Sequence, residues 1–122
     1  MVTLFFKGVL CNVLVCAAVW LAYAGRSVTD KLVAVVLPVS AFIAAGFEHC
    51  VANMYFLPLA WLLIRTGQVP ANFDASAVTV SGILHNLVPV TLGNIVGGAG
   101  FVGAFYWAIY RAAFAPNYPD EK

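Results

Sequence analysis

The feature that most constrains this chain is a nearly unbroken apolar stretch of 33 residues, from Leu32 to Ile64, with Glu48 and His49 near its middle. A continuous helix of that length would reach about 50 Å, whereas the hydrocarbon core of a bilayer is about 30 Å thick. We therefore expect an interruption, and we place it between Pro38 and Gly46. Proline removes a backbone donor, and glycine adopts dihedral angles that other residues avoid.

Two further apolar stretches flank this one. Residues 4–24 contain a single charge, Lys7, and residues 83–110 contain several glycines. Each is long enough to cross a bilayer. Of the whole chain, 63% is hydrophobic and 9% is charged, whereas about a quarter of the residues in soluble domains are charged. The sequence therefore predicts an all-α transmembrane chain with three spans, at about 4–24, 32–64 and 83–110, of which the middle one is broken.

The charged residues are few and scattered. No basic stripe could follow a nucleic acid, so we do not expect nucleic-acid binding. No catalytic triad, phosphate loop or metal motif occurs, so we expect neither enzyme activity nor a cofactor.

Three crossings would divide the cations between Lys7 and Arg65 on one side and Arg26, Lys31, Arg111 and Lys122 on the other. Since cytoplasmic loops carry the excess of Lys and Arg, we expect a multi-pass protein of the cell inner membrane with a cytoplasmic C-terminus.

The adjacent Glu48 and His49 are candidates for chemistry. An ionisable side chain inside a membrane segment normally faces a cavity or a partner, and imidazole exchanges protons near neutral pH. A helix that restarts near Gly46 would place both residues in its first turn, where the helix dipole favours anions. Asn53, four residues after His49, would share its face and could orient the imidazole or contact a substrate. Alternatively, Glu48 and His49 cap a half-helix, and Asn53 bonds a neighbouring backbone group.

The third apolar stretch carries fewer candidate groups. Gly93-x-x-x-Gly97 predicts close helix packing, and Asn94 inside the same stretch could make interhelical hydrogen bonds. His85 lies near the start of the stretch, where a hydrated histidine is expected.

Three segments resemble signatures of the formate/nitrite transporter family. They read GFEHCVANMY at 46–55, LCNVLVCAAVW at 10–20 followed by GRS, and NLVPVTLGNIVGG at 86–98. Their order and spacing match the C-terminal half of the family over nearly all of residues 1–122. The resemblance implies half of an aquaporin-like channel of six helices in inverted repeats, with five protomers that each hold a pore. The N-terminal half is absent here, so the chain is expected to be part of a longer protein, to be completed by a separate half-chain, or to be inactive.

The same resemblance implies a function and a set of pore residues. The chain would transport a small monovalent anion, formate or nitrite, with proton exchange at a central histidine; the substrate itself is not specified. The implied pore residues are His49 with Glu48 beside it, Asn12 and Asn94, with constrictions at Phe42 and Val15. Asn53, which helical spacing places on the face of His49, completes the set of candidate pore residues.

Two other functions remain open. A membrane subunit of a redox enzyme could hold a b-type haem between His49 and His85. A non-transporting half-chain or assembly partner would use its polar groups only to join helices.

Overall fold

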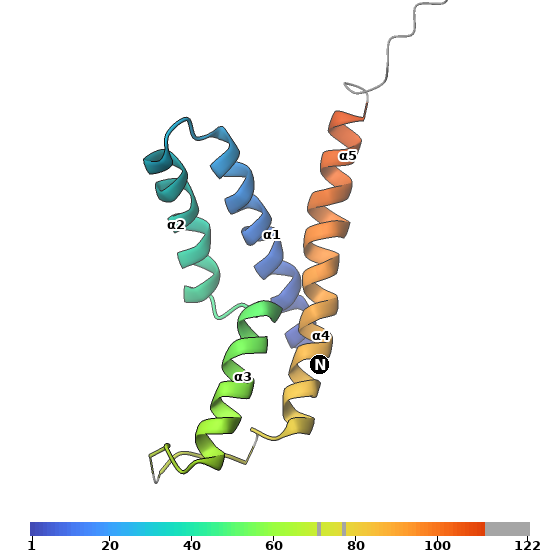
Figure 1. Cartoon of the computed structure of the whole chain (residues 1–122). Coiled ribbons are helices and arrows are strands. Elements are labelled where there is room, and N and C mark those ends of the chain that lie inside the picture. Colours follow the sequence, from blue (N-terminus) through green and yellow to red (C-terminus); the bar gives the residue numbers. More distant parts are fainter. Residues whose placement is uncertain (71, 77, 112–122) are drawn as a thin grey trace, which may run out of the picture.

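The computed structural model describes residues 1–70, 72–76 and 78–111, and every regular element among them is helical. The elements are α1 (Val2–Ala24), α2 (Val28–Ala44), α3 (Cys50–Arg65), α4 (Val80–Ile95), the π-helix η1 (Val96–Gly103) and α5 (Ala104–Tyr110). Because α4, η1 and α5 follow one another directly, they form one long helix (Figure 1). Lys122, one of the cations used for the orientation argument, lies outside the described residues.

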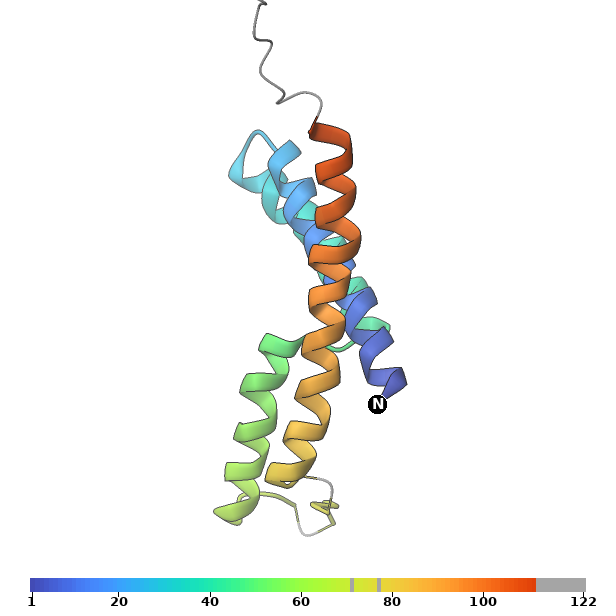
Figure 2. The ribbon, with the colours of Figure 1, turned by 90° about the vertical axis from the view of Figure 1, so that its right-hand side faces the viewer.

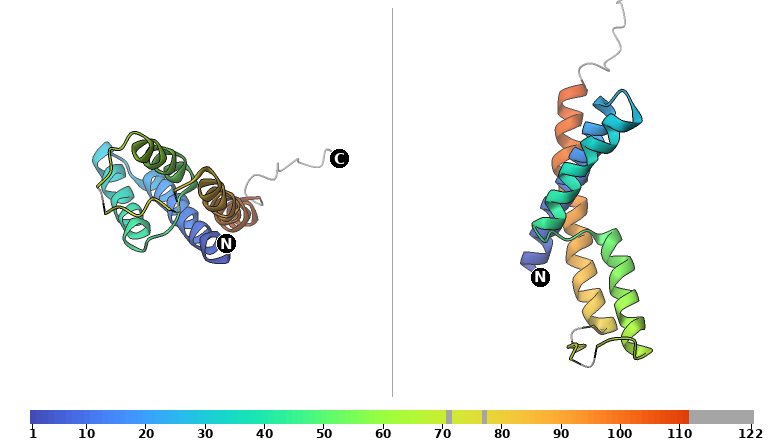
Figure 3. Two further views of the ribbon diagram at one scale, coloured as in Figure 1. Left: turned by 90° about the horizontal axis from the view of Figure 1, so that it is seen from below. Right: turned by 90° about the vertical axis from the view of Figure 1, so that its left-hand side faces the viewer.

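Helices α1 and α3 pack against this long helix. Helix α1 contacts α4 and η1 and carries α2 on its other side, and α3 lies beside α4 at the lower part of the long helix (Figure 1). Figure 2, turned by 90°, shows the same division between the two ends. Figure 3 shows that α2 ends and α3 begins part-way along the molecule, so the two helices together form one interrupted element.

Side-chain caps set where two of the helices begin. The Ser27 hydroxyl accepts a hydrogen bond from the Asp30 amide at 3.1 Å, and the Asp30 carboxylate accepts one from the Ser27 amide at 3.0 Å. This capping box starts α2 at Val28, before the predicted second span of residues 32–64. The Thr79 hydroxyl similarly accepts from the Gly82 amide at 3.0 Å, so α4 begins at Val80 rather than at the predicted 83.

The interruption lies at residues 45–49, later than most of the predicted range 38–46. Helix α2 continues through Pro38 to Ala44. It ends because Gly46 adopts a positive φ of 63°. The amides of Gly46 and Phe47 then donate to the carbonyl oxygens of Ile43 and Phe42, each at 3.0 Å, which is the Schellman pattern of a helix C-terminus. Glycine geometry, and not the missing proline donor, therefore sets the position of the interruption.

Helices α1 and α4 approach closely because glycines face backbone. A Cβ atom at Gly93 would overlap the carbonyl oxygen of Phe5, and one at Gly97 would overlap that of Val9. From α1, a Cβ at Gly8 would lie 2.7 Å from the Val90 carbonyl oxygen. The close packing predicted from Gly93-x-x-x-Gly97 is confirmed.

Length and composition make two helices suitable for crossing a membrane: Val2–Ala24 and the continuous Val80–Tyr110, with Cys50–Arg65 a shorter apolar helix. Large apolar side chains remain exposed on several helices, for example Leu37 at 77%, Tyr55 at 64% and Phe105 at 64%. Exposed apolar surface on this scale marks contact with lipid or with other protein.

Candidate functional site

The buried side chain of Asn94 joins three segments at the interruption. Asn94 is 4% exposed. Its Nδ2 donates to the carbonyl oxygens of Gly8 on α1, at 2.9 Å, and of Glu48, at 3.0 Å. Its Oδ1 accepts from the main-chain amide of Cys50 at 3.0 Å. Both amide hydrogens and the oxygen are therefore bonded, as expected for a buried polar group.

A second asparagine on α1 extends this network. Asn12 donates from Nδ2 to the main-chain oxygen of Asn94 at 2.6 Å. The structure thus brings together Asn12 and Asn94, the two asparagines for which the resemblance implies a pore-side position. Their hydrogen bonds fix α1 against α4 beside the interruption, which matches the interhelical role considered for Asn94. Contact of either residue with a substrate remains a prediction.

His49 is the N-cap residue of α3. Its Nδ1 accepts a long hydrogen bond, 3.4 Å, from the main-chain amide of Ala52. This contact occupies Nδ1, so Nε2 is the ring nitrogen left for another partner. Glu48 and His49 therefore precede the first turn of α3 instead of lying within it, and the capping alternative holds for His49.

The ring of His49 faces an aromatic side chain of α2. The ring centroids of His49 and Phe42 are 6.1 Å apart, and the rings are nearly parallel, with 26° between their planes. Phe42 belongs to the last turn of α2, so its ring reaches across the interruption to the N-cap residue of α3. The structure thus pairs the candidate proton-exchanging residue with a candidate constriction residue.

Glu48 is held by α3 and not by its neighbour His49. The Glu48 Oε2 accepts from Asn53 Nδ2 at 2.6 Å, and the same amide nitrogen donates to Asn86 Oδ1 on α4 at 2.8 Å. The expectation that Asn53 orients the imidazole is not met, since its amide binds the carboxylate. Sequence reasoning assigned no role to Asn86. The sequence feature that could have indicated a role for Asn86 is its polar side chain near the start of an apolar stretch.

Two of the residues singled out in the sequence lie outside this polar cluster. Val15 is half-buried on α1 and takes no part in these hydrogen bonds, and a constriction there remains a prediction. His85 is exposed on α4. Within the residues that the structure describes, no group of three or more His, Cys, Asp and Glu side chains could hold a metal ion.

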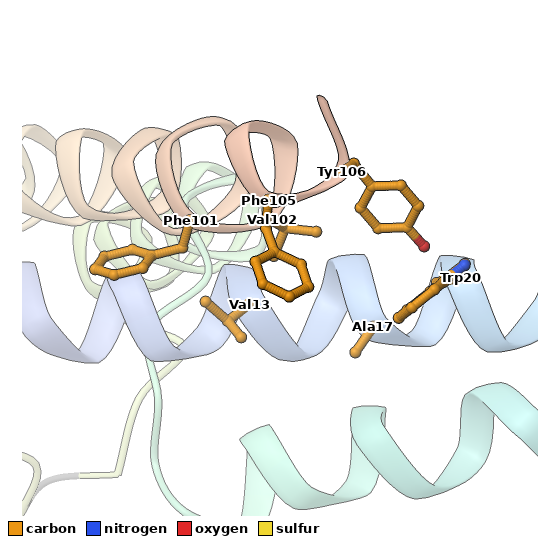
Figure 4. Close-up of a pocket in the computed structure, with 7 residues that line it drawn as sticks. All are labelled: Val13, Ala17, Trp20, Phe101, Val102, Phe105 and Tyr106. Atoms are coloured by element: carbon orange, nitrogen blue, oxygen red, sulfur yellow. The ribbon is translucent and has the colours of Figure 1, made fainter. Parts of the chain in front are cut away.

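An apolar groove lies apart from the polar cluster, between α1 and the η1–α5 part of the long helix (Figure 4). Its volume is about 310 Å³, and its lining residues are Val13, Ala17, Trp20, Phe101, Val102, Phe105 and Tyr106. The rings of Trp20 and Tyr106 meet edge to face, with centroids 4.7 Å apart. The groove shares no residue with the cluster around Asn94, so it offers packing surface and no polar group to the candidate site.

Comparison with known proteins identifies the family. A family profile described as Formate/nitrite transporter matches residues 1–108 of the chain. The chain belongs to the formate/nitrite transporter family. The family recognised from the three sequence segments is thereby confirmed, and a family of transporters makes this chain a membrane protein.

The relatives within the formate/nitrite transporter family are named for two different substrates, formate and nitrite. The formate channel FocA of Escherichia coli (strain K12) is 46% identical over 113 aligned positions, which cover 84% of this chain and 39% of FocA. The nitrite transporter NirC of Salmonella typhimurium is 45% identical over 104 positions, covering 85% of this chain and 35% of NirC. This chain therefore spans well under half the length of these relatives.

A solved structure of the formate/nitrite transporter family has a similar fold. It is described as a pentameric formate channel with formate bound, and it is 44% identical with a TM-score of 0.73. The similarity covers 88% of this chain and 46% of the solved chain. The helices of this chain thus follow the arrangement of helices in part of a channel protomer.

Proposed function

We propose that this chain forms part of a transmembrane pathway for small monovalent anions, formate or nitrite, and that His49 exchanges a proton with the anion at its centre. The observation that carries the proposal is the interrupted helix itself. Non-helical backbone at membrane depth is tolerated where it is buried in protein or lines a wet cavity. Here that backbone presents an imidazole beside the N-terminus of α3. The named activities of FocA and NirC supply the substrate class.

The physical reason for a proton exchange is the free energy of burying charge. Moving an unpaired carboxylate into apolar surroundings is highly unfavourable, so a bare anion does not cross an apolar constriction. His49 that has taken up a proton from solution is an imidazolium, and passing that proton to formate or nitrite would give neutral formic or nitrous acid and leave a neutral imidazole. Because Nδ1 faces the Ala52 amide, Nε2 is the ring nitrogen at which the proton would be exchanged with the anion.

The other site residues take supporting roles in this proposal. Phe42, stacked on His49, and Val15 on α1 would narrow the pathway with apolar surface. Asn12 and Asn94 would hold α1 and the interrupted segment in register. Glu48 would remain fixed by Asn53 at the start of α3.

The architecture forms the second part of the proposal. Residues 1–122 would supply the C-terminal half of a six-helix protomer built from inverted repeats, with three spans and the middle one broken. The exposed apolar faces of the helices would contact the remaining half, lipid or other protomers of a pentamer like the solved relative. The chain would lie in the cell inner membrane with its C-terminus in the cytoplasm, as the charge distribution suggests.

The test is anion flux in proteoliposomes that contain this chain, measured across an imposed pH gradient. Formate and nitrite flux should depend on pH in the parent chain, and His49→Phe should abolish the flux or remove its coupling to protons. His85→Phe is the matched control, since His85 is exposed and outside the cluster. Equal flux and equal pH dependence in the parent and His49→Phe would contradict the role of His49. No flux from the folded parent would contradict transport by this chain alone.

A further inference from the structure

The pair Asn53 and Asn86 forms the only hydrogen bond between a side chain of α3 and a side chain of α4 among the described residues. Asn53 Nδ2 donates to Asn86 Oδ1 at 2.8 Å and to Glu48 Oε2 at 2.6 Å. An amide nitrogen carries two hydrogens, and here each of them has one acceptor. Glu48, Asn53 and Asn86 therefore form a chain of hydrogen bonds that runs from the interruption to α4.

The chemistry of the three groups fixes the direction of this chain. The Glu48 oxygen accepts from Asn53 Nδ2, so the nitrogen of the Asn53 amide, and not its oxygen, faces Glu48. The second hydrogen of that nitrogen then requires an acceptor, and the Asn86 oxygen supplies it. Asn86 thereby holds the Asn53 amide in this orientation, and through it the Glu48 carboxylate.

Helix α4, which carries Asn86, is held in place by its packing. The same helix is in backbone contact with α1 through Gly93, and Asn94 binds both α1 and the interrupted segment. In contrast, Glu48 lies on non-helical backbone, where its side chain would otherwise have several accessible rotamers. A hydrogen bond from a rigid helix restricts those rotamers.

We infer that Asn86 is a positioning residue, which acts through Asn53 to keep the Glu48 carboxylate directed along α3 and away from the free edge of the His49 imidazole. This inference rests on the proposed function, since it assigns the reason why the carboxylate must be held. A carboxylate free to move could accept a hydrogen bond from His49 Nε2, and it would then compete with the incoming anion and repel it.

The expected consequence is a selective loss of apparent affinity. In proteoliposomes, Asn86→Leu removes the acceptor but keeps the number and branching of the side-chain heavy atoms. It should raise the half-saturating formate concentration by about fivefold, the effect of losing one neutral hydrogen bond. The maximal flux should change much less. Asn86→Gln returns an amide oxygen and should recover part of the affinity. Thr91→Val is the control on the same helix, because Thr91 lines a separate apolar surface with Leu87, Val88 and Leu92.

A spectroscopic measurement on the reconstituted chain separates this inference from the proposed function. Asn86→Leu should shift one of the two side-chain amide proton signals of Asn53, speed its exchange with water, and move the carboxyl ¹³C signal of Glu48. Thr91→Val should leave all three unchanged. Unmoved Asn53 and Glu48 signals in Asn86→Leu would overturn the inference, as would an equal loss of affinity in Thr91→Val. If His49→Phe transports normally while the Asn53 and Glu48 signals respond to Asn86→Leu, the proposed proton exchange fails and the positioning of Glu48 stands.

Discussion

The side chain of Asn94 donates a hydrogen bond to the main-chain oxygen of Glu48, 3.0 Å away, from a helix 46 positions further along the chain. The same side chain accepts from the amide of Cys50 at 3.0 Å. Asn94 therefore bonds the backbone on both sides of His49. A single buried amide sets where the imidazole stands, although its own hydrogen bonds go to backbone groups and not to the ring.

The first prediction concerns this amide. Asn94→Ala should lower the free energy of unfolding by about 1 to 3 kcal/mol, because it leaves the Glu48 carbonyl and the Cys50 amide without their partner. Unfolding in mixed detergent micelles, followed by circular dichroism, measures the change. Asn72→Ala is the control, since Asn72 is exposed in the loop before α4. Equal stability of both variants would show that Asn94 does not hold the interrupted segment.

The second prediction tests the close approach of α1 and the long helix. Gly97→Ala should destabilise the chain by about 1 to 3 kcal/mol, because the new methyl group would overlap the Val9 carbonyl oxygen and force the helices apart. Gly100→Ala, in the same π-helix, should be tolerated, since its nearest neighbour would be the Val96 Cγ1 atom at 3.8 Å. The melting temperatures of the two variants, measured by thermal unfolding, test this difference. Similar melting temperatures would contradict the packing argument.

The third prediction compares two glycines with positive φ angles, of which only Gly46 lies next to the candidate site. Gly46 and Gly67 both have positive φ angles, 63° and 68°, and a Cβ atom at either position would meet nothing within 4 Å. Replacement by alanine should therefore destabilise each site by about 1 kcal/mol through backbone strain alone. Only Gly46→Ala should also change formate flux, because Gly46 leads directly into Glu48 and His49. Flux lost equally in Gly67→Ala would point to general destabilisation.

The fourth prediction concerns acid. The pKa of the exposed Asp30 carboxyl is lower than its usual value. The causes are hydrogen bonds to the main-chain amide of Ser27, to the Ser27 hydroxyl and to the main-chain amide of Arg26. A pKa lowered by folding stabilises the helix N-terminus above the unfolded pKa of about 3.9. That stabilisation is lost as the pH falls through the folded pKa. A carboxyl ¹³C titration should give Asp30 a lower pKa than a reference peptide, and Ser27→Ala should raise it.

A stability measurement checks the same cap. The parent chain should be more stable than Asp30→Asn at neutral pH, and the difference should shrink as the solution is acidified below pH of about 4. A difference that stays constant down to strongly acidic pH would show that the charge of Asp30 does not contribute. Because the carboxyl is exposed, added salt should also weaken the effect.

The sequence by itself determined the helical and apolar character of the chain and its family, and it indicated the Glu48–His49 pair as a candidate site. These properties are local: hydropathy is a sum over neighbouring residues, and the family segments are continuous runs of letters. The interruption was also visible in the sequence, but its position was displaced toward Pro38. A proline removes only its own donor, and α2 accommodates it, whereas Gly46 supplies the positive φ that ends the helix.

Only the tertiary structure decided which polar groups meet. Asn94 bonds Gly8 across 86 positions, and Asn53 bonds Asn86 across 33. Nothing in the spacing of residues along one helix predicts such pairs, and helical spacing alone wrongly directed Asn53 toward His49. The choice depends on how closely α1 and α4 approach, which the glycine contacts allow, and on the buried donors and acceptors that this approach leaves to be paired.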